Sequence, residues 1–365
     1  MAFATTAELI EEMRNGRMVI VVDDEDRENE GDLIMAAEHA AAAAVTFMIR
    51  QTSGILCVAM EQERLTALEL PQMVQNNAEA YRTAFTVSVD YRHGTTTGVS
   101  ADDRVATIRA LAAADSRPQD FVRPGHIFPL RARLGGVLTR AGHTEAAVDL
   151  CRLAGLQPAG VLCEVMNPDG SMARRPQLEA FAREHGLKIG SIADLIRHRL
   201  ATEKTVTRKF ERELDTAFGR FRVVGYRDEL TGLAHFALVR GEVSDGAPVL
   251  TRVHVRDTLS DVLQLARADG AVPLSAALRH VAAQGRGAVV VLSDADEARD
   301  ALERLERLDA PREADATHEW RRHGVGAQIL ADLGVRRLRV LGTPRRYLGL
   351  SGFGVEIDGY EEPLA

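Results

Sequence analysis

The densest cluster of charged side chains lies in the segment DDEDRENEGD, residues 23–32, where ten positions hold seven carboxylates and one arginine. Apolar runs flank the segment on both sides, so the sequence predicts a loop between two strands. Carboxylates at this density repel one another unless solvent or a cation neutralises them. The segment is therefore a solvated acidic turn or a cation site. Gly31, which permits a sharp bend, and Arg27 beside Glu28 favour the site.

A second candidate site lies in TRAGHTEAAVDLCRLAG, residues 139–155. The pattern predicts a strand end at 137–139, a tight turn, and a helix that Thr144 caps. Free backbone N–H groups and the helix dipole bind anions at such a helix start, and Arg140 would add a charge-assisted hydrogen bond. Phosphate fits this arrangement. A single arginine before a helix start is weak evidence by itself, and so is His143 alone.

Glu164 interrupts an otherwise apolar run, VLCEVM, at residues 161–166, which the pattern predicts to be a buried strand. A carboxylate in such a strand is rare unless it is paired. It is either a structural residue bonded to the backbone or to an arginine, or a group that transfers protons. His126, next to Gly125, lies in a predicted turn.

The bulk composition indicates a two-domain protein of a reducing compartment. A chain of 365 residues is long for one domain and sufficient for two, each with its own core. Its formal net charge of -8 argues against an extended nucleic-acid or anionic membrane surface. Cys57, Cys151 and Cys163 form no C-x-x-C pair, and the acidic amino terminus lacks the features of a signal peptide. No apolar run reaches membrane-spanning length, so we expect a cytoplasmic protein.

Residues 1 to about 200 resemble the 3,4-dihydroxy-2-butanone 4-phosphate synthase family of riboflavin biosynthesis. The resemblance rests on five motifs in family order: DDEDRENEGD, HGTTTGVSADDR, GHIFPLRA, TRAGHTEA and VLCEVMN. It implies conversion of D-ribulose 5-phosphate to 3,4-dihydroxy-2-butanone 4-phosphate and formate. It also implies a homodimer with its sites near the subunit interface.

The resemblance implies roles for individual residues. Glu28 and His143 would bind a divalent cation, magnesium or manganese. His126 and Glu164 would be catalytic, which disfavours a noncatalytic metal-binding protein. The substrate-binding residues would be Arg27, Glu28, Asp32, Arg140, Ala141, Gly142, His143, Thr144 and Glu164.

The second half resembles GTP cyclohydrolase II through DTAFGRFRVVGYRD, RVHVRD, GVGAQILADLGVRRLRVLGTP and LSGFGVEI. Active members of that family need three zinc-binding thiolates, the first shortly after the RVH segment. Here Asp257 takes that place, and residues 259–278 contain no cysteine. We therefore expect no zinc and no GTP ring opening.

Alternatives remain for this half of the chain. It could be a noncatalytic dimerisation, scaffold or regulatory module, which we prefer, or the protein could be bifunctional and retain GTP cyclohydrolase II activity. Zinc bound elsewhere would need some of the remaining histidines: His235, His254, His318 and His323.

The expected fold is α/β, with α+β character in the first half, in two domains that each layer a mixed sheet with helices. We place the domain limits at 1–204 and 205–365, joined by a short linker. Beyond the linker the periodicity predicts strands at 218–226, 234–243 and 288–292 and helices at 257–267 and 275–283.

Overall fold

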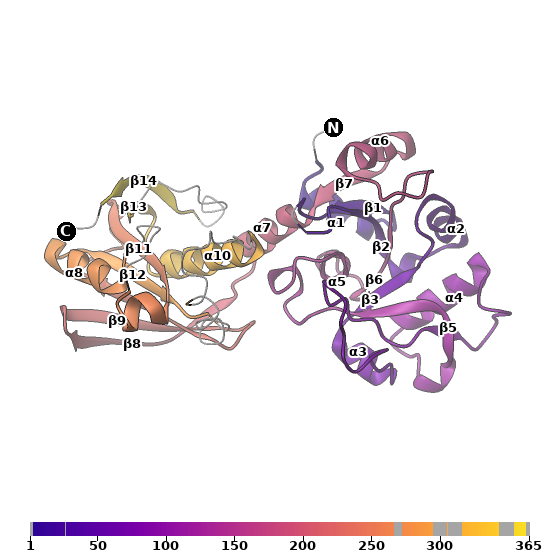
Figure 1. Ribbon diagram of the computed structural model, residues 1–365, viewed down its shortest axis with the longest axis horizontal. Coiled ribbons are helices and arrows are strands. Elements are labelled where there is room, and N and C mark those ends of the chain that lie inside the picture. Colours follow the sequence, from indigo (N-terminus) through magenta and orange to yellow (C-terminus); the bar gives the residue numbers. More distant parts are fainter. Residues whose placement is uncertain are drawn as a thin grey trace. The chain divides into compact units, whose positions relative to one another are not determined.

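The computed structural model describes residues 3–25, 27–265, 272–294, 305, 316–342 and 354–362. The chain divides into two compact units, Met1–His198 and Arg199–Ala365 (Figure 1). Each unit contains a mixed sheet with helices, which confirms the predicted α/β class and two-domain organisation. The exact limits of 1–204 and 205–365 remain a prediction.

A seven-stranded sheet in the order β4-β5-β3-β6-β2-β1-β7 forms the centre of the first unit. Its strands are β1 (Val19–Val22), β2 (Gly31–Ala36), β3 (Cys57–Met60), β4 (Val89–Tyr91), β5 (Phe121–Arg131), β6 (Ala159–Glu164) and β7 (Lys188–Ser191). The pairs β1–β7 and β3–β5 are parallel and the other neighbours are antiparallel. The sheet therefore combines hairpins, such as β1–β2, with crossover connections.

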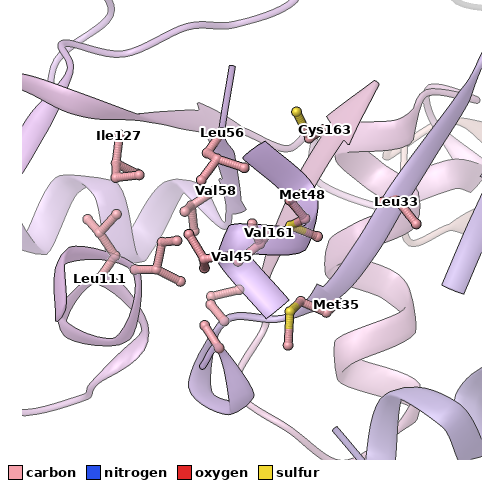
Figure 2. Packing of buried hydrophobic residues seen from close by; sticks show 14 of the residues in the cluster. Leu33, Met35, Val45, Met48, Leu56, Val58, Leu111, Ile127, Val161 and Cys163 are labelled. Atoms are coloured by element: carbon pink, nitrogen blue, oxygen red, sulfur yellow. The ribbon is translucent and has the colours of Figure 1, made fainter. Parts of the chain in front are cut away.

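The helices of this unit lie on both faces of the sheet. They are α1 (Thr6–Arg14), α2 (Ala42–Gln51), α3 (Gln62–Ala67), α4 (Ala101–Ala112), α5 (His143–Leu153), α6 (Arg175–His185) and α7 (Ile192–Thr202), with 3-10 turns η1 (Ala37–His39), η2 (Pro118–Asp120) and η3 (Gly136–Leu138). Residues of α2, α4 and α6 share one buried cluster with β6. Figure 2 shows Met48 of α2 and Leu111 of α4 in this cluster with Val161 and Cys163 of β6. Gly160 points to the opposite face, where an added Cβ would meet Ala147 of α5 at 2.9 Å. Even-numbered residues of β6 therefore face α5.

The second unit also has a seven-stranded sheet, in the order β14-β13-β11-β12-β10-β9-β8. The described elements are β8 (Val206–Thr216), β9 (Gly219–Asp228), β10 (Ala234–Arg240), β11 (Val249–Val255), the π-helix η4 (Thr258–Val262), α8 (Leu274–Gln284), β12 (Gly287–Leu292), α10 (Ala316–Asp332), β13 (Arg337–Leu341) and β14 (Glu356–Glu361). Along β12, Val290 joins a buried cluster with Ile329 of α10, and Val289 joins another with Val281 of α8. Helices therefore cover both faces of this sheet.

In this unit, the strands predicted at 218–226, 234–243 and 288–292 and the helix predicted at 275–283 are found close to their expected limits, as β9, β10, β12 and α8. The linker is short as predicted, because α7 ends at Thr202 and β8 begins at Val206. The helix predicted at 257–267 is confirmed only in part: η4 covers residues 258–262, residues 263–265 are not helical, and residues 266–271 lie outside the description.

None of the helices in the described ranges is both long enough and apolar enough to cross a lipid bilayer.

Candidate functional site

Strand register brings two of the predicted site carboxylates together at one end of the first sheet. In the antiparallel ladders Val21 pairs with Asp32, and Asp32 pairs with Glu164. Directly paired residues project from the same face of a sheet. Glu164 has the same parity as Gly160, so both carboxylates face α5, whose first residue is His143.

His143 is buried beside these carboxylates. Its Nε2 lies 3.1 Å from the Val21 carbonyl, which can only accept a hydrogen bond, so Nε2 carries a proton. Its Nδ1 lies 3.5 Å from Oε2 of Glu28 and 3.8 Å from Oδ1 of Asp32. In the neutral imidazole, the Nδ1 lone pair would thus face two carboxylates. A backbone carbonyl that orients a histidine in this way is typical of a metal ligand.

The acidic loop is built around the buried side chain of Asp23. Its Oδ1 accepts a hydrogen bond from the Glu30 amide at 2.8 Å, and its Oδ2 accepts from the Glu28 amide at 3.0 Å and from Nη1 of Arg27 at 2.9 Å. Nη1 of Arg27 also donates to Oε2 of Glu28 at 2.7 Å. One carboxylate therefore determines the loop conformation that turns Glu28 toward His143. The sequence pattern did not distinguish Asp23 from the other acidic residues of the loop.

The charges of this cluster are strongly interdependent. Burial raises the pKa of Asp32 well above its usual range. Burial lowers the pKa of His143, but the charges of Asp32, Asp23 and Glu28 and the hydrogen bond to Glu28 outweigh it, and the pKa rises. For Glu28, burial raises the pKa, while the hydrogen bond with His143 and the charge of Arg27 lower it to about 2. Positive charge thus stabilises the carboxylate of Glu28, whereas burial outweighs it at Asp32 and favours the protonated carboxyl.

The donor set of this cluster fits a divalent cation. Asp23, Glu28 and His143 each offer a ligand atom within 4.8 Å of the others, and no other trio of histidine, cysteine, aspartate or glutamate does so in the described part of the chain. Since Asp23 already accepts three hydrogen bonds, Glu28 and His143 are the freer donors. Asp32 adds a buried Oδ1 without a hydrogen-bond partner among the described residues. Oxygen donors with one imidazole suit magnesium or manganese.

The buried strand predicted at 161–166 is found as β6, which is buried from Ala159 to Cys163, but Glu164 is its last residue and is only half-buried. Its Oε2 accepts a hydrogen bond from Oγ of Ser53 at 2.8 Å, and the Ser53 amide donates to its backbone carbonyl at 2.9 Å. Ser53 therefore fixes both the backbone and the side chain of this residue.

The segment Arg140–Thr144 differs from its prediction in two details. Gly142 is the N-cap of α5, and Thr144 is a buried residue of its first turn, so the predicted Thr144 cap is wrong. Residues 136–138 form η3 where a strand end was expected. The chain bends here through a 3-10 turn, and the glycine provides the extended backbone that precedes a helix.

Arg140 is already held by protein partners. Its Nη1 donates to Oε2 of the buried Glu145 at 2.7 Å, and its Nη2 contacts the Tyr81 carbonyl at 3.1 Å and Oγ1 of Thr83 at 3.2 Å. Glu145 also accepts from the Arg133 amide at 3.0 Å. The buried carboxylate of Glu145 thus lies in the first turn of α5. It is the third helical residue, where a glutamate is typical of a helix start, so the sequence could have predicted this role for Glu145. Ala141 is half-buried between Arg140 and the N-cap.

His126 is not part of this cluster within one chain. It lies in β5 and not in the predicted turn. Phe128 aligns with Leu162 through Cys57, and His126 precedes Phe128 toward the end of the sheet at which Glu164 lies. In the strand order, β3 and β6 lie between β5 and β2, so three strand spacings, about 14 Å, separate the strand of His126 from that of Asp32. Asp90, which no sequence signal indicated, contacts the His126 ring.

In the second unit, the residues near the expected zinc position make local hydrogen bonds. Asp257 caps η4, where its Oδ1 accepts from the amides of Leu259 and Ser260. Nε2 of His254 lies 2.8 Å from Oδ2 of Asp261. Nδ1 of His235 accepts from the Ser293 amide at 3.0 Å. The side chains of His318 and His323 lie outside the described residues.

Family models match both halves of the chain: 3,4-dihydroxy-2-butanone 4-phosphate synthase over residues 7–198 and GTP cyclohydrolase II over residues 207–362. A 3,4-dihydroxy-2-butanone 4-phosphate synthase of Pseudomonas aeruginosa is 51% identical over 362 residues, 99% of each chain. The bifunctional riboflavin biosynthesis protein RIBA 1, chloroplastic, of Arabidopsis thaliana is 48% identical over 377 residues, 98% of this chain and 68% of that protein.

Solved structures resemble the chain at two scales. RibBX, a two-domain 3,4-dihydroxy-2-butanone 4-phosphate synthase from A. baumannii, superposes with a TM-score of 0.84 at 42% identity, covering 98% of this chain and 99% of the other. A 3,4-dihydroxy-2-butanone 4-phosphate synthase crystallised with two magnesium ions matches with a TM-score of 0.53 at 48% identity, covering 55% of this chain and 98% of the other.

Replacing Asp23 with Ala should loosen the acidic loop, because the amides of Glu28 and Glu30 lose their acceptor. An unmade hydrogen bond of this kind costs about 1–3 kcal/mol, so we expect both amides to exchange with solvent about 10- to 100-fold faster, measured by NMR hydrogen exchange. Glu25→Ala, an exposed change in the same loop, is the control and should leave both rates unchanged. Equal rates in the two variants would contradict the role of Asp23.

Proposed function

The chain belongs to the 3,4-dihydroxy-2-butanone 4-phosphate synthase family, and we propose that its first domain converts D-ribulose 5-phosphate to 3,4-dihydroxy-2-butanone 4-phosphate and formate. The observation that carries this proposal is the convergence of Glu28, Asp32 and Glu164 with His143 at one end of the sheet. The reaction needs repeated proton transfers around a carbonyl, and this cluster combines cation ligands with a separate carboxylate. The direct test is formate release from ribulose 5-phosphate by the purified full chain with magnesium.

Glu28 and His143 would hold the divalent cation. When bound, magnesium or manganese would polarise the sugar carbonyl and stabilise the charge of an enediolate. Asp23 would keep Glu28 in place. The Val21 carbonyl would keep the proton of His143 on Nε2, so that Nδ1 would face the cation. The relative with two magnesium ions supports this choice of cation.

The remaining site residues would bind the substrate and move its protons. Arg27 and the segment Arg140–Thr144 would hold the sugar phosphate, with Ala141 and Gly142 keeping that turn close to the bound molecule. Asp32 and Glu164 are adjacent carboxylates on one face, so either can exchange a proton with a substrate that lies across them. Ser53 would keep the Glu164 carboxylate aimed at that substrate.

A homodimer would give His126 access to a catalytic site. Within one chain its strand lies three strand spacings, about 14 Å, from that of Asp32, which is too far for both side chains to hydrogen-bond to the same reacting atoms. Its ring is partly exposed at the same end of the sheet, where a second subunit could meet it. We therefore propose a cytoplasmic homodimer with the sites near the subunit interface.

We propose that the second domain is a noncatalytic dimerisation, scaffold or regulatory module. The observation in favour is Asp257, whose carboxylate caps η4 at the place where a zinc-binding cysteine is expected. The bifunctional Arabidopsis relative favours the alternative, an enzyme that also retains GTP cyclohydrolase II activity.

Glu28→Ala should remove the cation site. We expect formate release from ribulose 5-phosphate to fall by more than about 100-fold and manganese binding, measured by electron paramagnetic resonance, to be lost. Excess chelator should abolish the activity of the unchanged protein, and added magnesium or manganese should restore it. Glu25→Ala should retain both activity and metal binding; full activity of Glu28→Ala, or of the protein in chelator, would refute the metal assignment.

Glu164→Gln should retain the substrate and lose turnover. The amide keeps the shape of the side chain and can still accept from Ser53, but it cannot carry a proton at neutral pH. We expect kcat to fall by about 10²- to 10⁴-fold while substrate affinity, measured by calorimetry, stays within a few-fold. An unchanged kcat would make Glu164 a structural residue.

The full chain should contain no stoichiometric zinc and release no formate from GTP. Elemental analysis and a GTP assay of the purified protein test this expectation, which follows from the missing thiolates. Stoichiometric zinc together with GTP-derived formate would establish the bifunctional alternative.

A further inference from the structure

His126 and Asp90 form a close pair that the cation cluster does not include. Oδ2 of Asp90 lies 2.7 Å from Nδ1 of His126, and Oδ1 of Asp90 accepts a hydrogen bond from the His126 backbone amide at 2.9 Å. The aspartate side chain is 9% exposed and the histidine side chain 45% exposed. A buried carboxylate thus holds the backbone and the ring of an accessible imidazole.

Two glycines allow the chain to close around this pair. A Cβ on Gly125, the residue before His126, would overlap the backbone of Val89, next to Asp90. A Cβ on Gly98 would overlap the Asp90 carboxylate itself. Gly98 ends the HGTTTG segment, and its amide donates to Oδ2 of Asp103 at 3.0 Å, which anchors that turn to α4. The two motifs on either side of α4 therefore enclose one aspartate–histidine pair.

The geometry determines the proton position on His126. An ionised Asp90 has only acceptors, so Nδ1 of the imidazole must donate to it. The second nitrogen, Nε2, then carries a lone pair, and it makes no hydrogen bond with any described residue. A neutral histidine with its lone pair on the accessible nitrogen is arranged to accept a proton.

We propose that Asp90 is a positioning residue that holds His126 in the tautomer with a free Nε2, so that His126 can accept a proton in the synthase reaction. This inference rests on the proposed function, because it assigns His126 to that reaction. Asp90 itself need not touch the substrate. Its part is to orient the ring and to exclude the tautomer in which Nε2 would be a donor.

Asp90→Asn tests the proposal by reversing the tautomer without changing the shape. The His126 amide must still donate to an oxygen, so the asparagine oxygen remains at the Oδ1 position and its NH₂ group faces Nδ1 of the ring. Nδ1 must then accept, and the proton moves to Nε2. We expect ¹⁵N-histidine NMR, with the His126 signals assigned from His126→Gln, to show protonation at Nδ1 in the unchanged protein and at Nε2 in Asp90→Asn.

The same variant should lose turnover selectively. We expect kcat for formate release to fall by about 10²- to 10⁴-fold, while KM changes less than about threefold and manganese binding is unchanged. Loss of both substrate and metal binding would instead indicate a purely structural role. Asp90→Glu retains a carboxylate and should recover part of the lost kcat.

The pair formed by His93 and Asp120 is the matched control. Nε2 of His93 lies 3.1 Å from Oδ1 of Asp120, whose Oδ2 accepts from the Arg117 amide at 2.8 Å. Asp120→Asn should therefore reverse the tautomer of His93 by the same mechanism. We expect kcat to remain unchanged in that variant, since nothing places His93 in the reaction.

The outcomes separate this inference from the proposed function. An unchanged protein that releases no formate refutes the proposed function, while the NMR result still tests the tautomer. An active protein in which Asp90→Asn keeps full kcat refutes the positioning role. If Asp90→Asn does not fold, an Nε2 proton on His126 in the unchanged protein refutes the proposal, and an Nδ1 proton supports it.

Discussion

The burial of the His143 imidazole against Glu28 and Asp32 constrains the rest of the first domain. Moving charges from water into a protein interior costs on the order of several kcal/mol per ion, and only close opposite charge and hydrogen bonds offset that cost. Here the imidazole and Arg27 compensate the charge of Glu28, whereas the burial of Asp32 outweighs the same positive charge and raises its pKa; a divalent cation would add the charge that Asp32 lacks. Such a group of carboxylates must be held by the surrounding structure, because mutual repulsion and hydration would otherwise move the side chains apart and into solvent.

That surrounding structure comes from several parts of the chain. Asp23 holds the backbone of the acidic loop through the amides of Glu28 and Glu30. The hydroxyl of Tyr81 donates to the Arg27 carbonyl at 3.0 Å, and the Tyr81 carbonyl accepts from Arg140. The segment around Tyr81 therefore ties the acidic loop to the turn before α5. A change in either element would reach the other through this residue.

In the second domain, the polar groups around η4 bond to one another. Asp257, at the place where the resemblance implies a zinc-binding cysteine, caps η4 through its own carboxylate. Asp261 then accepts from both His254 and the Asp257 amide, at 2.8 and 2.9 Å. The polar groups of Asp257, His254 and Asp261 therefore have hydrogen-bond partners within a few residues of the chain. The sheet itself has helices on both faces.

The sequence by itself determined the family, the α/β class and the presence of two domains, because ordered motifs and apolar periodicity are local properties of the chain. It also indicated a loop between strands at 23–32, since charge density and flanking apolar runs are visible there; in the structure the loop is shorter, because Gly31 and Asp32 already belong to β2. It could not single out Asp23 or Asp90, because each is one acidic residue among many until the backbone amides it serves are known. Likewise, the distance between His126 and the cation cluster depends on strand order, which no local pattern records. Only the tertiary structure decided which carboxylates are buried, which are paired, and which histidine each of them orients.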